Sequence, residues 1–242
     1  MGNAVGARCR VSVIIPLYCE SGNLNALINH LVPRGDIDEL VIVDASRDQA
    51  SIDAWKAVWP KLEDASGDLF IVSAVVKGRA VQMNQGAELA SGDVLLFLHG
   101  DTRLPATDLR RLLAKAETAG WGRFDVCFES SEFWARVVAF MMNLRSRLTG
   151  IATGDQAIFI GSRLWQQVGG FAQLPLMEDI EICKRLVRAA SPLCLRQTVK
   201  TSARRWQNNG VVRTVILMWL LRFFYWLGVS PQRLAQWYRN AR

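Results

Sequence analysis

Cysteine is scarce in this sequence, and no two cysteines have the close spacing of a metal-binding or redox pair. The five cysteines are scattered, odd in number and without a Cys-x-x-Cys spacing, at positions 9, 19, 127, 183 and 194. That pattern argues against a disulfide framework and against a zinc site, and fits a reducing cytosol. The N-terminus also lacks an apolar run long enough for a signal peptide before the first expected strand. We therefore expect a cytoplasmic protein.

Acidic residues are absent from one end of the chain. The segment 204–242 contains seven arginines and no Asp or Glu, so it accounts for the whole net charge of +7. A basic tail can meet nucleic acid, anionic lipid or a phosphorylated substrate. The segment also holds four of the nine tryptophans, and tryptophan beside arginine is typical of a membrane interface. We expect a peripheral contact with the inner face of the cell membrane and no nucleic-acid partner.

No long hydrophobic run is free of charge. The most apolar stretch, 211–229, approaches the ~20 residues needed to span a bilayer, but Arg213 and Arg222 interrupt it. At ~100° per residue these two arginines lie on opposite sides of a helix. We expect a helix at the membrane interface, with two alternatives: a helix packed on the rest of the chain or in a dimer contact, and a membrane span.

Apolar runs alternate with helical patterns through most of the chain. Half of the residues are hydrophobic, enough for a sizeable core. We expect strands at 11–15, 39–43, 69–75, 94–98, 123–129 and 157–160, and helices at 23–31, 79–90, 133–148 and 178–190. This alternation predicts an α/β fold with a doubly wound, mostly parallel sheet flanked by helices. We assign 1–203 to one α/β domain and 204–242 to a basic, aromatic helical tail.

Polar residues follow several of the expected strands. Glu20, Asp44 and Asp101 stand there, and ligands of doubly wound sheets bind at the carboxyl ends of strands. Acidic residues also favour turns, so a structural role is the alternative at each position. Lys77 and Arg79 flank Gly78 at a helix start, which is either a phosphate cradle or a solvated loop.

The expected helix at 178–190 begins with two acids. Glu178 and Asp179 are favoured there by the helix dipole alone, and one of them acting as a general base is the functional alternative. Asp155 and Gln156 precede a short strand. They are candidates for the side of a binding site where an acceptor substrate would lie, or for a simple turn.

Taken in order, these segments resemble the family 2 glycosyltransferases, which have the GT-A fold. The pieces that carry the resemblance span about 11–206 and comprise 12–20, 41–48, 77–80 with Asn84, 98–102, 169–171 and 178–179. Within that family the chain is similar to a small bacterial subgroup associated with radical-SAM and selenium-domain gene neighbourhoods. The resemblance implies a hexosyltransferase-like enzyme that uses a nucleoside diphosphate sugar.

The resemblance also implies a role for each matching residue. Pro16 and Glu20 would shape the nucleotide pocket, and Asp44 would bind the base, uracil or guanine. Lys77 and Arg79 would lie near the phosphates. Asp179 would be the catalytic base, with Glu178 beside it.

The metal motif departs from the family pattern. Asp101 matches the last acid of the D-x-D motif that binds Mn²⁺ or Mg²⁺, but His99 replaces the first acid. Histidine suits Mn²⁺ better than Mg²⁺. Arg205 and Trp206 match the end of the Q-x-x-R-W motif of processive members, but its glutamine is missing. We expect these two residues on the acceptor side, and a single transfer rather than polymer growth.

We therefore predict an inverting transfer of a sugar from a nucleoside diphosphate to an acceptor hydroxyl or phosphate, with a lipid-linked acceptor if the tail is interfacial. A nucleotidyltransferase is one alternative, because such enzymes also place metal-binding acids on an α/β nucleotide domain. The other is a non-catalytic protein that binds membranes or nucleic acid and uses an inactive nucleotide fold.

Overall fold

The computed structural model describes residues 9–63, 68–74 and 76–241; the side chains of residues 63, 118, 119, 205, 208 and 209 lie outside this description. The strands are β1 (Val11–Leu17), β2 (Glu39–Asp44), β3 (Asp68–Ser73), β4 (Val94–Phe97), β5 (Thr102–Arg103), β6 (Trp121–Phe128), β7 (Ile158–Gly161) and β8 (Leu193–Thr201). The helices are α1 (Ser21–Leu31), α2 (Gln49–Glu63), α3 (Arg79–Leu89), α4 (Leu109–Ala119), α5 (Phe133–Thr149), α6 (Ser162–Val168), α7 (Glu178–Ala189), α8 (Arg204–Asn209), α9 (Val211–Trp226) and α10 (Pro231–Asn240), and η1 (Gly154–Gln156) is a 3₁₀ turn.

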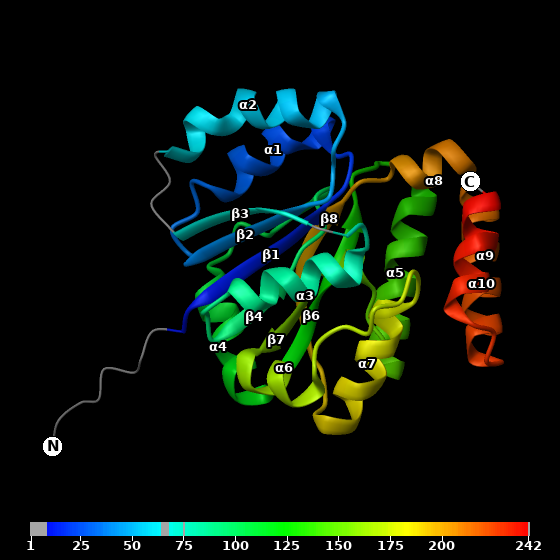
Figure 1. Ribbon diagram of the computed structural model, residues 1–242. Helices are drawn as coiled ribbons and strands as arrows, with labels where there is room; N and C mark the ends of the chain where they lie inside the picture. Colours follow the sequence, from blue (N-terminus) through cyan, green and yellow to red (C-terminus); the bar gives the residue numbers. More distant parts are fainter. Residues whose placement is uncertain (1–8, 64–67, 75, 242) are drawn as a thin grey trace, which may run out of the picture.

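These strands form one sheet in the order β3-β2-β1-β4-β7-β6-β8-β5 (Figure 1). The first four run parallel to one another. β7 is antiparallel to both β4 and β6, β8 is parallel to β6, and β5 is antiparallel to β8. The predicted α/β class and mostly parallel sheet are confirmed, and the antiparallel β7 is a feature that the sequence pattern did not reveal.

Two apolar layers cover the sheet, one on each face. Residues of α1, α2 and α4 pack in one cluster with Val13, Ile15 and Leu96. Residues of α3, α6 and α7 pack in the other with Ile14 and Val41. Successive strand side chains point to opposite faces, so β1 serves both layers with alternate residues. The layer of α3 and α7 matters for function, because it brings residues from the two halves of the chain together.

The expected helices and strands are found close to their predicted bounds. β3 ends at Ser73, and the predicted end at Val75 lies outside the described residues. α2, α4 and β8 were not predicted. The α2 segment includes Pro60, which interrupts a helical pattern, and β8 contains polar residues at 196–198 and 200 instead of forming one apolar run. Both features weaken the periodic signal that sequence reasoning depends on.

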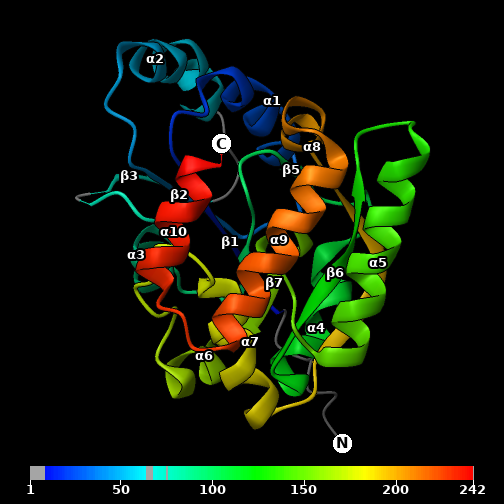
Figure 2. The same cartoon turned by 90° about the vertical axis from the view of Figure 1, so that its right-hand side faces the viewer.

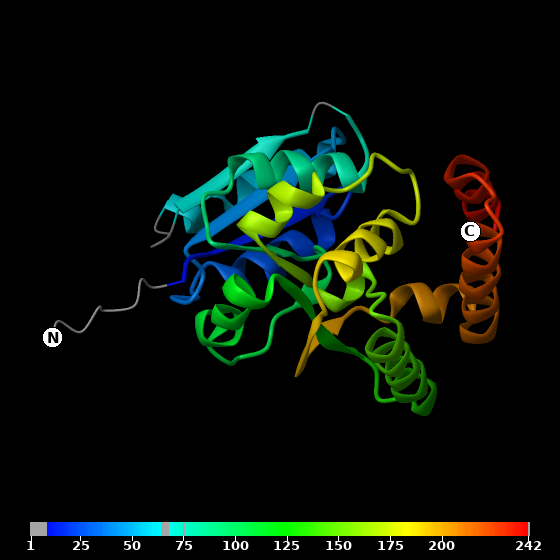
Figure 3. The same ribbon diagram turned by 90° about the horizontal axis from the view of Figure 1, so that it is seen from below.

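The C-terminal helices pack against the start of α7. Leu221 of α9 and Leu234 of α10 form a buried cluster with Met177 and Ile180. Figure 3 shows α9 and α10 at the outer edge of the molecule, with α8 leading to them. Among the described helices, none is both long and apolar enough to cross a bilayer. Because Leu221 packs in this cluster, one face of α9 lies against the α/β domain. Such packing is one of the three interpretations given for 211–229.

Candidate active site

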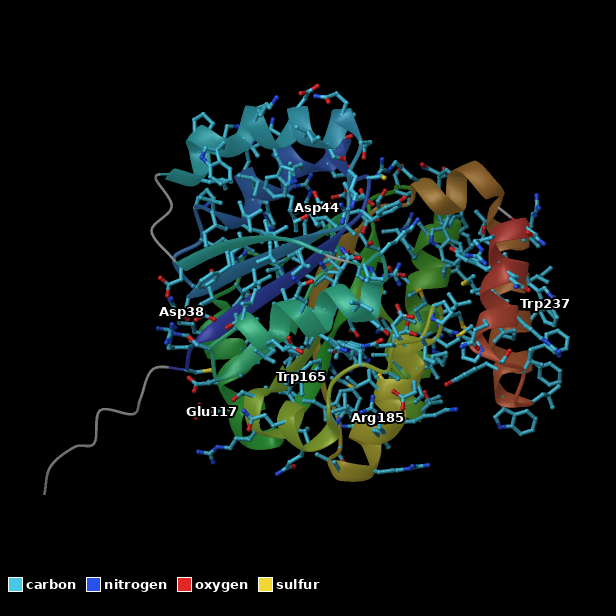
Figure 4. The ribbon with its side chains drawn as sticks, viewed as in Figure 1. Asp38, Asp44, Glu117, Trp165, Arg185 and Trp237 are labelled. Atoms are coloured by element: carbon cyan, nitrogen blue, oxygen red, sulfur yellow. The ribbon has the colours of Figure 1, made fainter. Side chains whose placement is uncertain are left out.

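Asp44 ends β2, and both of its carboxylate oxygens already accept hydrogen bonds. The Ser46 backbone N–H donates to Oδ1 at 2.8 Å, and the Trp55 indole N–H donates to Oδ2 at 2.6 Å. The residue is buried at the carboxyl end of the parallel strands (Figure 4). A carboxylate oxygen has a second lone pair, so Asp44 can accept a further donor, such as a base N–H, without losing these bonds.

Pro16 and Glu20 border the same end of the sheet. Pro16 is half-buried near the end of β1, opposite Val43 of β2. Glu20 precedes α1, and its Oε2 accepts from the Asn23 amide at 2.7 Å and lies 3.8 Å from Nη2 of Arg204. Glu20 thus connects the loop after β1 to the segment that follows β8.

Two polar residues of α3 fix this region, and sequence reasoning did not single out their roles. The Gln82 amide donates to the carbonyls of Leu17 and Val43, at 2.6 and 2.8 Å. The Asn84 amide donates to the Phe171 carbonyl at 2.8 Å and accepts from the Phe171 N–H at 2.9 Å. Amides inside a helical pattern look like surface residues, so only the tertiary contacts reveal these functions.

Two cations stand at the start of α3. The Lys77 ammonium lies 3.7 Å from the centroid of the exposed Tyr18 ring. Arg79 Nη1 lies 3.2 Å from Oε1 of Glu178, which is buried. Arg79 is about half exposed, so it is open to a ligand from solvent. The structure therefore joins two predicted site residues that are 99 positions apart in the chain.

Asp179 sits half-buried in the first turn of α7. Its Oδ1 accepts from the Ile180 N–H at 2.8 Å, and its Oδ2 accepts from the Gly154 N–H at 3.3 Å. Burial and the adjacent Glu178 raise the pKa of Asp179 to about 6, although Arg79 and these N–H groups oppose the shift. A carboxylate with such a pKa is suited to accept a proton near neutral pH.

His99 pairs with Asp155. Its Nδ1 lies 3.2 Å from Oδ1 of Asp155. Its Nε2 is buried with no hydrogen-bond partner among the described residues, and a Cβ on Gly154 would stand only 2.3 Å from that nitrogen. In this arrangement neither ring nitrogen is open to a metal ion, so His99 is a partner of Asp155 rather than an available ligand.

Asp101 fits a metal ion better than His99 does. Among the described residues its one hydrogen bond is long, 3.5 Å from the Thr102 hydroxyl, so its oxygens remain available. The described residues contain no group of three or more His, Cys, Asp or Glu side chains that could hold a metal. Magnesium bound to nucleotides often has one or two carboxylate ligands and takes the rest from phosphates and water. A single carboxylate from Asp101 is compatible with that mode.

A cavity of about 300 Å³ lies beside Asp101. Its walls include Asn23 and His30 of α1, together with Arg103 and Arg204. Asp44, Lys77, Arg79 and Asp179 do not line it. The predicted site residues are therefore divided: Asp101 faces this cavity, and Arg79, Glu178 and Asp179 gather at the facing starts of α3 and α7.

The residues predicted for the acceptor side have different surroundings. Gln156 is completely buried, and its amide donates to the Ser146 hydroxyl at 3.0 Å, which ties η1 to α5. Trp206 packs against Phe128 and Trp134 in an aromatic cluster. The Arg205 side chain lies outside the described residues. Among the acceptor-side residues whose side chains the structure describes, Asp155 lies close to Asp179. It belongs to η1, and the Gly154 N–H of that turn donates a hydrogen bond to the Asp179 carboxylate.

Arg145 of α5 is a residue of this region that the sequence did not suggest. Its Nε and Nη2 are buried and have no hydrogen-bond partner among the described residues. Burial lowers the pKa of Arg145, and the charge of Asp179 opposes that shift. An arginine near the C-terminal end of an amphipathic helix looks like a surface residue, so no sequence signal identifies it.

Two comparisons place this geometry among known proteins. The model of the family described as glycosyl transferase family 2 matches residues 12–167. Among solved structures, the mannosyltransferase PcManGT from Pyrobaculum calidifontis, in complex with GDP-Man and Mn²⁺, superposes with a TM-score of 0.66 at 18% identity. That alignment covers 96% of this chain and 69% of the other.

Two further structures share the fold. S. aureus TarS aligns with a TM-score of 0.60 at 17% identity, covering 85% of this chain and 39% of TarS. GalNAc-T7 with UDP, GalNAc and Mn²⁺ aligns with a TM-score of 0.61 at 13% identity, covering 81% of this chain and 44% of that enzyme. The chain thus spans less than half the length of these two larger proteins, and identities this low establish the fold alone.

Proposed function

The chain belongs to glycosyl transferase family 2, and from this premise we propose that it moves a hexose from a nucleoside diphosphate sugar to an acceptor hydroxyl or phosphate, with inversion at the anomeric carbon. The observation that carries the proposal is the environment of Asp179. Its carboxylate is half-buried, has a raised pKa, and lies beside the Arg79–Glu178 pair at the facing ends of α3 and α7.

In this reaction Asp179 removes the proton of the acceptor O–H as that oxygen attacks the anomeric carbon. The new C–O bond forms as the bond to the phosphate oxygen breaks, and the nucleoside diphosphate leaves with the electron pair. The Gly154 and Ile180 N–H groups orient the Asp179 carboxylate. Arg79, which is half exposed, interacts with the negative charge of the diphosphate.

Asp101 would hold a divalent metal between the protein and the diphosphate. Bound there, Mn²⁺ or Mg²⁺ supplies positive charge to the leaving group. The structural relatives crystallised with Mn²⁺ support this part of the proposal. Asp44 and the loop after β1, with Pro16 and Glu20, would receive the base. A uridine or guanosine diphosphate is our choice, since relatives carry GDP-Man and UDP.

The finer assignments extend the same proposal. We place the protein at the cytoplasmic face of a membrane, held by 204–242, where a lipid-linked acceptor is within reach. We also assign it to the radical-SAM and selenium-domain associated subgroup on the motifs described above. Nucleotidyl transfer is the weaker candidate, because the family model that matches the chain is that of glycosyl transferases.

A thermal-shift screen tests the donor assignment. UDP, GDP, CDP and dTDP are compared with and without Mn²⁺ or Mg²⁺. We expect one diphosphate to raise the melting temperature in a metal-dependent way, because saturation at 100 times the dissociation constant stabilises a fold by ~2.7 kcal/mol. Asp101→Asn should lose the metal dependence. Absence of a shift with every diphosphate and metal would contradict the proposal.

A further inference from the structure

Helix α5 carries an exposed apolar stripe on its outer side. At about 100° per residue, its six exposed large apolar residues fall within an arc of about 100°. They are Phe133, Val137, Phe140, Met141, Leu144 and Leu148. The opposite side of the helix is buried, at Ala135, Ala139 and Ser146. Contiguous apolar surface of this kind usually marks an interaction site.

Helix α9 repeats this pattern. Its exposed large apolar residues again fall within an arc of about 120°. They are Val212, Ile216, Trp219, Leu220, Phe223 and Trp226. Arg213 and Arg222, nine residues apart, lie about 90° to either side of the middle of this stripe. The two arginines that seem to spoil the amphipathic pattern therefore flank the apolar face, where long side chains reach lipid headgroups.

The charged residues within the C-terminal helices and α5 have one sign. α5, α8, α9 and α10 together contain nine arginines and no aspartate or glutamate. Arg136 is exposed and lies at the edge of the α5 stripe. By contrast, α2, which also exposes apolar residues at Ile52 and Trp59, contains acidic residues as well. A surface that combines apolar stripes with an excess of arginines complements an anionic bilayer.

Both helices lie on the same side of the molecule. Figures 1 and 2 show α5, α9 and α10 on the side away from α2, and Figure 4 places Trp237 of α10 at its outer edge. The packed face of α9 contacts Met177 and Ile180, which are next to Asp179 along the chain. The exposed stripe of α9 is thus one helix diameter away from the start of α7.

We propose that α5 and α9 together form one docking surface that lies in the headgroup region of an anionic lipid bilayer. The inference rests on the proposed function. It extends the membrane contact beyond the tail, because α5 is a helix of the catalytic domain itself. Contact through the exposed stripes of both α5 and α9 fixes the orientation of the domain on the membrane and brings the α7 end of the site close to the lipid. A second copy of the chain is a poorer occupant, because pairing these faces would bring arginines against arginines.

Vesicle flotation of the full chain tests this inference, with phosphatidylcholine vesicles that contain or lack phosphatidylglycerol. Three double variants are compared: Phe140→Ser with Leu148→Ser on α5, Trp219→Ser with Trp226→Ser on α9, and the control Ile52→Ser with Trp59→Ser on α2. All six positions are exposed, so folding should survive. Arg136→Glu is a second α5 variant that removes no apolar contact.

We expect the unmodified protein to float only with anionic vesicles. The α5 and α9 double variants should each bind at least tenfold more weakly, and Arg136→Glu should weaken binding several-fold, while the α2 control binds normally. Normal binding by both α5 variants would overturn the inference. So would failure of the unmodified protein to bind, or a concentration-dependent dimer that the α5 and α9 variants abolish.

The outcomes for docking and for catalysis can be separated. Nucleotide-induced thermal shifts are measured on the same variants, and none of the mutated positions belongs to the proposed site. Lost flotation with a normal nucleotide shift concerns the membrane surface alone. Normal flotation without any nucleotide shift contradicts the sugar-transfer proposal and leaves the docking surface intact.

Discussion

The two halves of the site differ in how completely their polar groups are paired. At the ends of β1 and β2, both oxygens of Asp44 are hydrogen-bonded, and Gln82 satisfies two strand-end carbonyls. Around η1 and α7, His99 Nε2 and two nitrogens of Arg145 are buried with no partner among the described residues. The Asp179 carboxylate there has a raised pKa.

This difference separates a preformed binding region from a reactive one. Buried polar groups are normally paired, and exceptions concentrate where a ligand or a reaction completes the environment. The paired half can hold a nucleotide with little reorganisation. The unpaired half keeps a carboxylate poised to take up a proton. The predictions below probe each half, from the largest expected effect to the smallest.

Removing the carboxylate of Asp179 should have the largest effect. Asp179→Asn should lower turnover by about 10²–10⁴-fold, the usual contribution of a general base, and leave nucleotide binding nearly unchanged. Glu181→Gln is the matched control, since Glu181 lies in the same helical turn but pairs with Arg185 on the surface. Equal losses in the two variants would mean that the acids act only through the helix dipole.

Removing the Asp101 carboxylate should act through metal binding. Asp101→Asn should lower turnover by roughly 10²-fold, equivalent to about 3 kcal/mol, because it removes a metal ligand worth several kcal/mol. The loss should be accompanied by a weaker metal-dependent thermal shift. Glu129→Gln, which removes a nearby carboxylate paired with Arg103, serves as the control. Turnover of Asp101→Asn equal to that of the unmodified protein would exclude Asp101 as the ligand.

The pH dependence should report Asp179. A base must be deprotonated, so kcat/KM should rise about tenfold per pH unit below the pKa and level off above about 6. The same shift has the opposite sign for stability: a raised pKa favours the folded protein when Asp179 is protonated, and that stabilisation is lost as the pH rises through about 6. Asp179→Asn should therefore melt higher than the unmodified protein at pH 8, but not at pH 4. A flat kcat/KM profile between pH 5 and 8 would contradict this assignment.

The smallest effect should come from the connection between the two halves. Asn84→Ala leaves the N–H and carbonyl of Phe171 without their partners and should lower the free energy of unfolding by ~1–3 kcal/mol. Gln85→Ala, at the adjacent position, should change it by less than about 0.5 kcal/mol. Urea unfolding measures both. Similar stabilities of the two variants would show that the Asn84 contacts contribute little.

The same division explains what the sequence could predict. Strand ends such as Asp44 and Asp101 follow apolar runs directly, so local pattern is enough to identify them. The base Asp179 was suggested only by resemblance, because a helix-start acid has a structural explanation too. Arg145 was not identified, and Asn84 was noted only through the family resemblance, since the roles of both depend on contacts between segments far apart in the chain. The His99–Asp155 pair was also beyond reach, because spacing suggested a metal ligand and only the fold brings Asp155 to the ring.

The exposed surface of the tail could not be predicted from the sequence for the same reason. The sequence showed that Arg213 and Arg222 lie on opposite sides of a helix, but not which face is packed. Once Leu221 is known to be buried, the two arginines become the borders of an exposed apolar stripe. The α5 stripe was missed altogether, because exposed and buried apolar residues are alike in a sequence.

The products formed from a nucleotide sugar test the central claim most directly. The full chain is incubated with UDP- and GDP-hexoses, Mn²⁺ and anionic vesicles that carry a polyprenyl phosphate, and the released phosphates are identified. The account predicts free nucleoside diphosphate, formed by the unmodified protein and not by Asp179→Asn. Release of pyrophosphate, or equal release of nucleoside diphosphate by the two proteins, would contradict it.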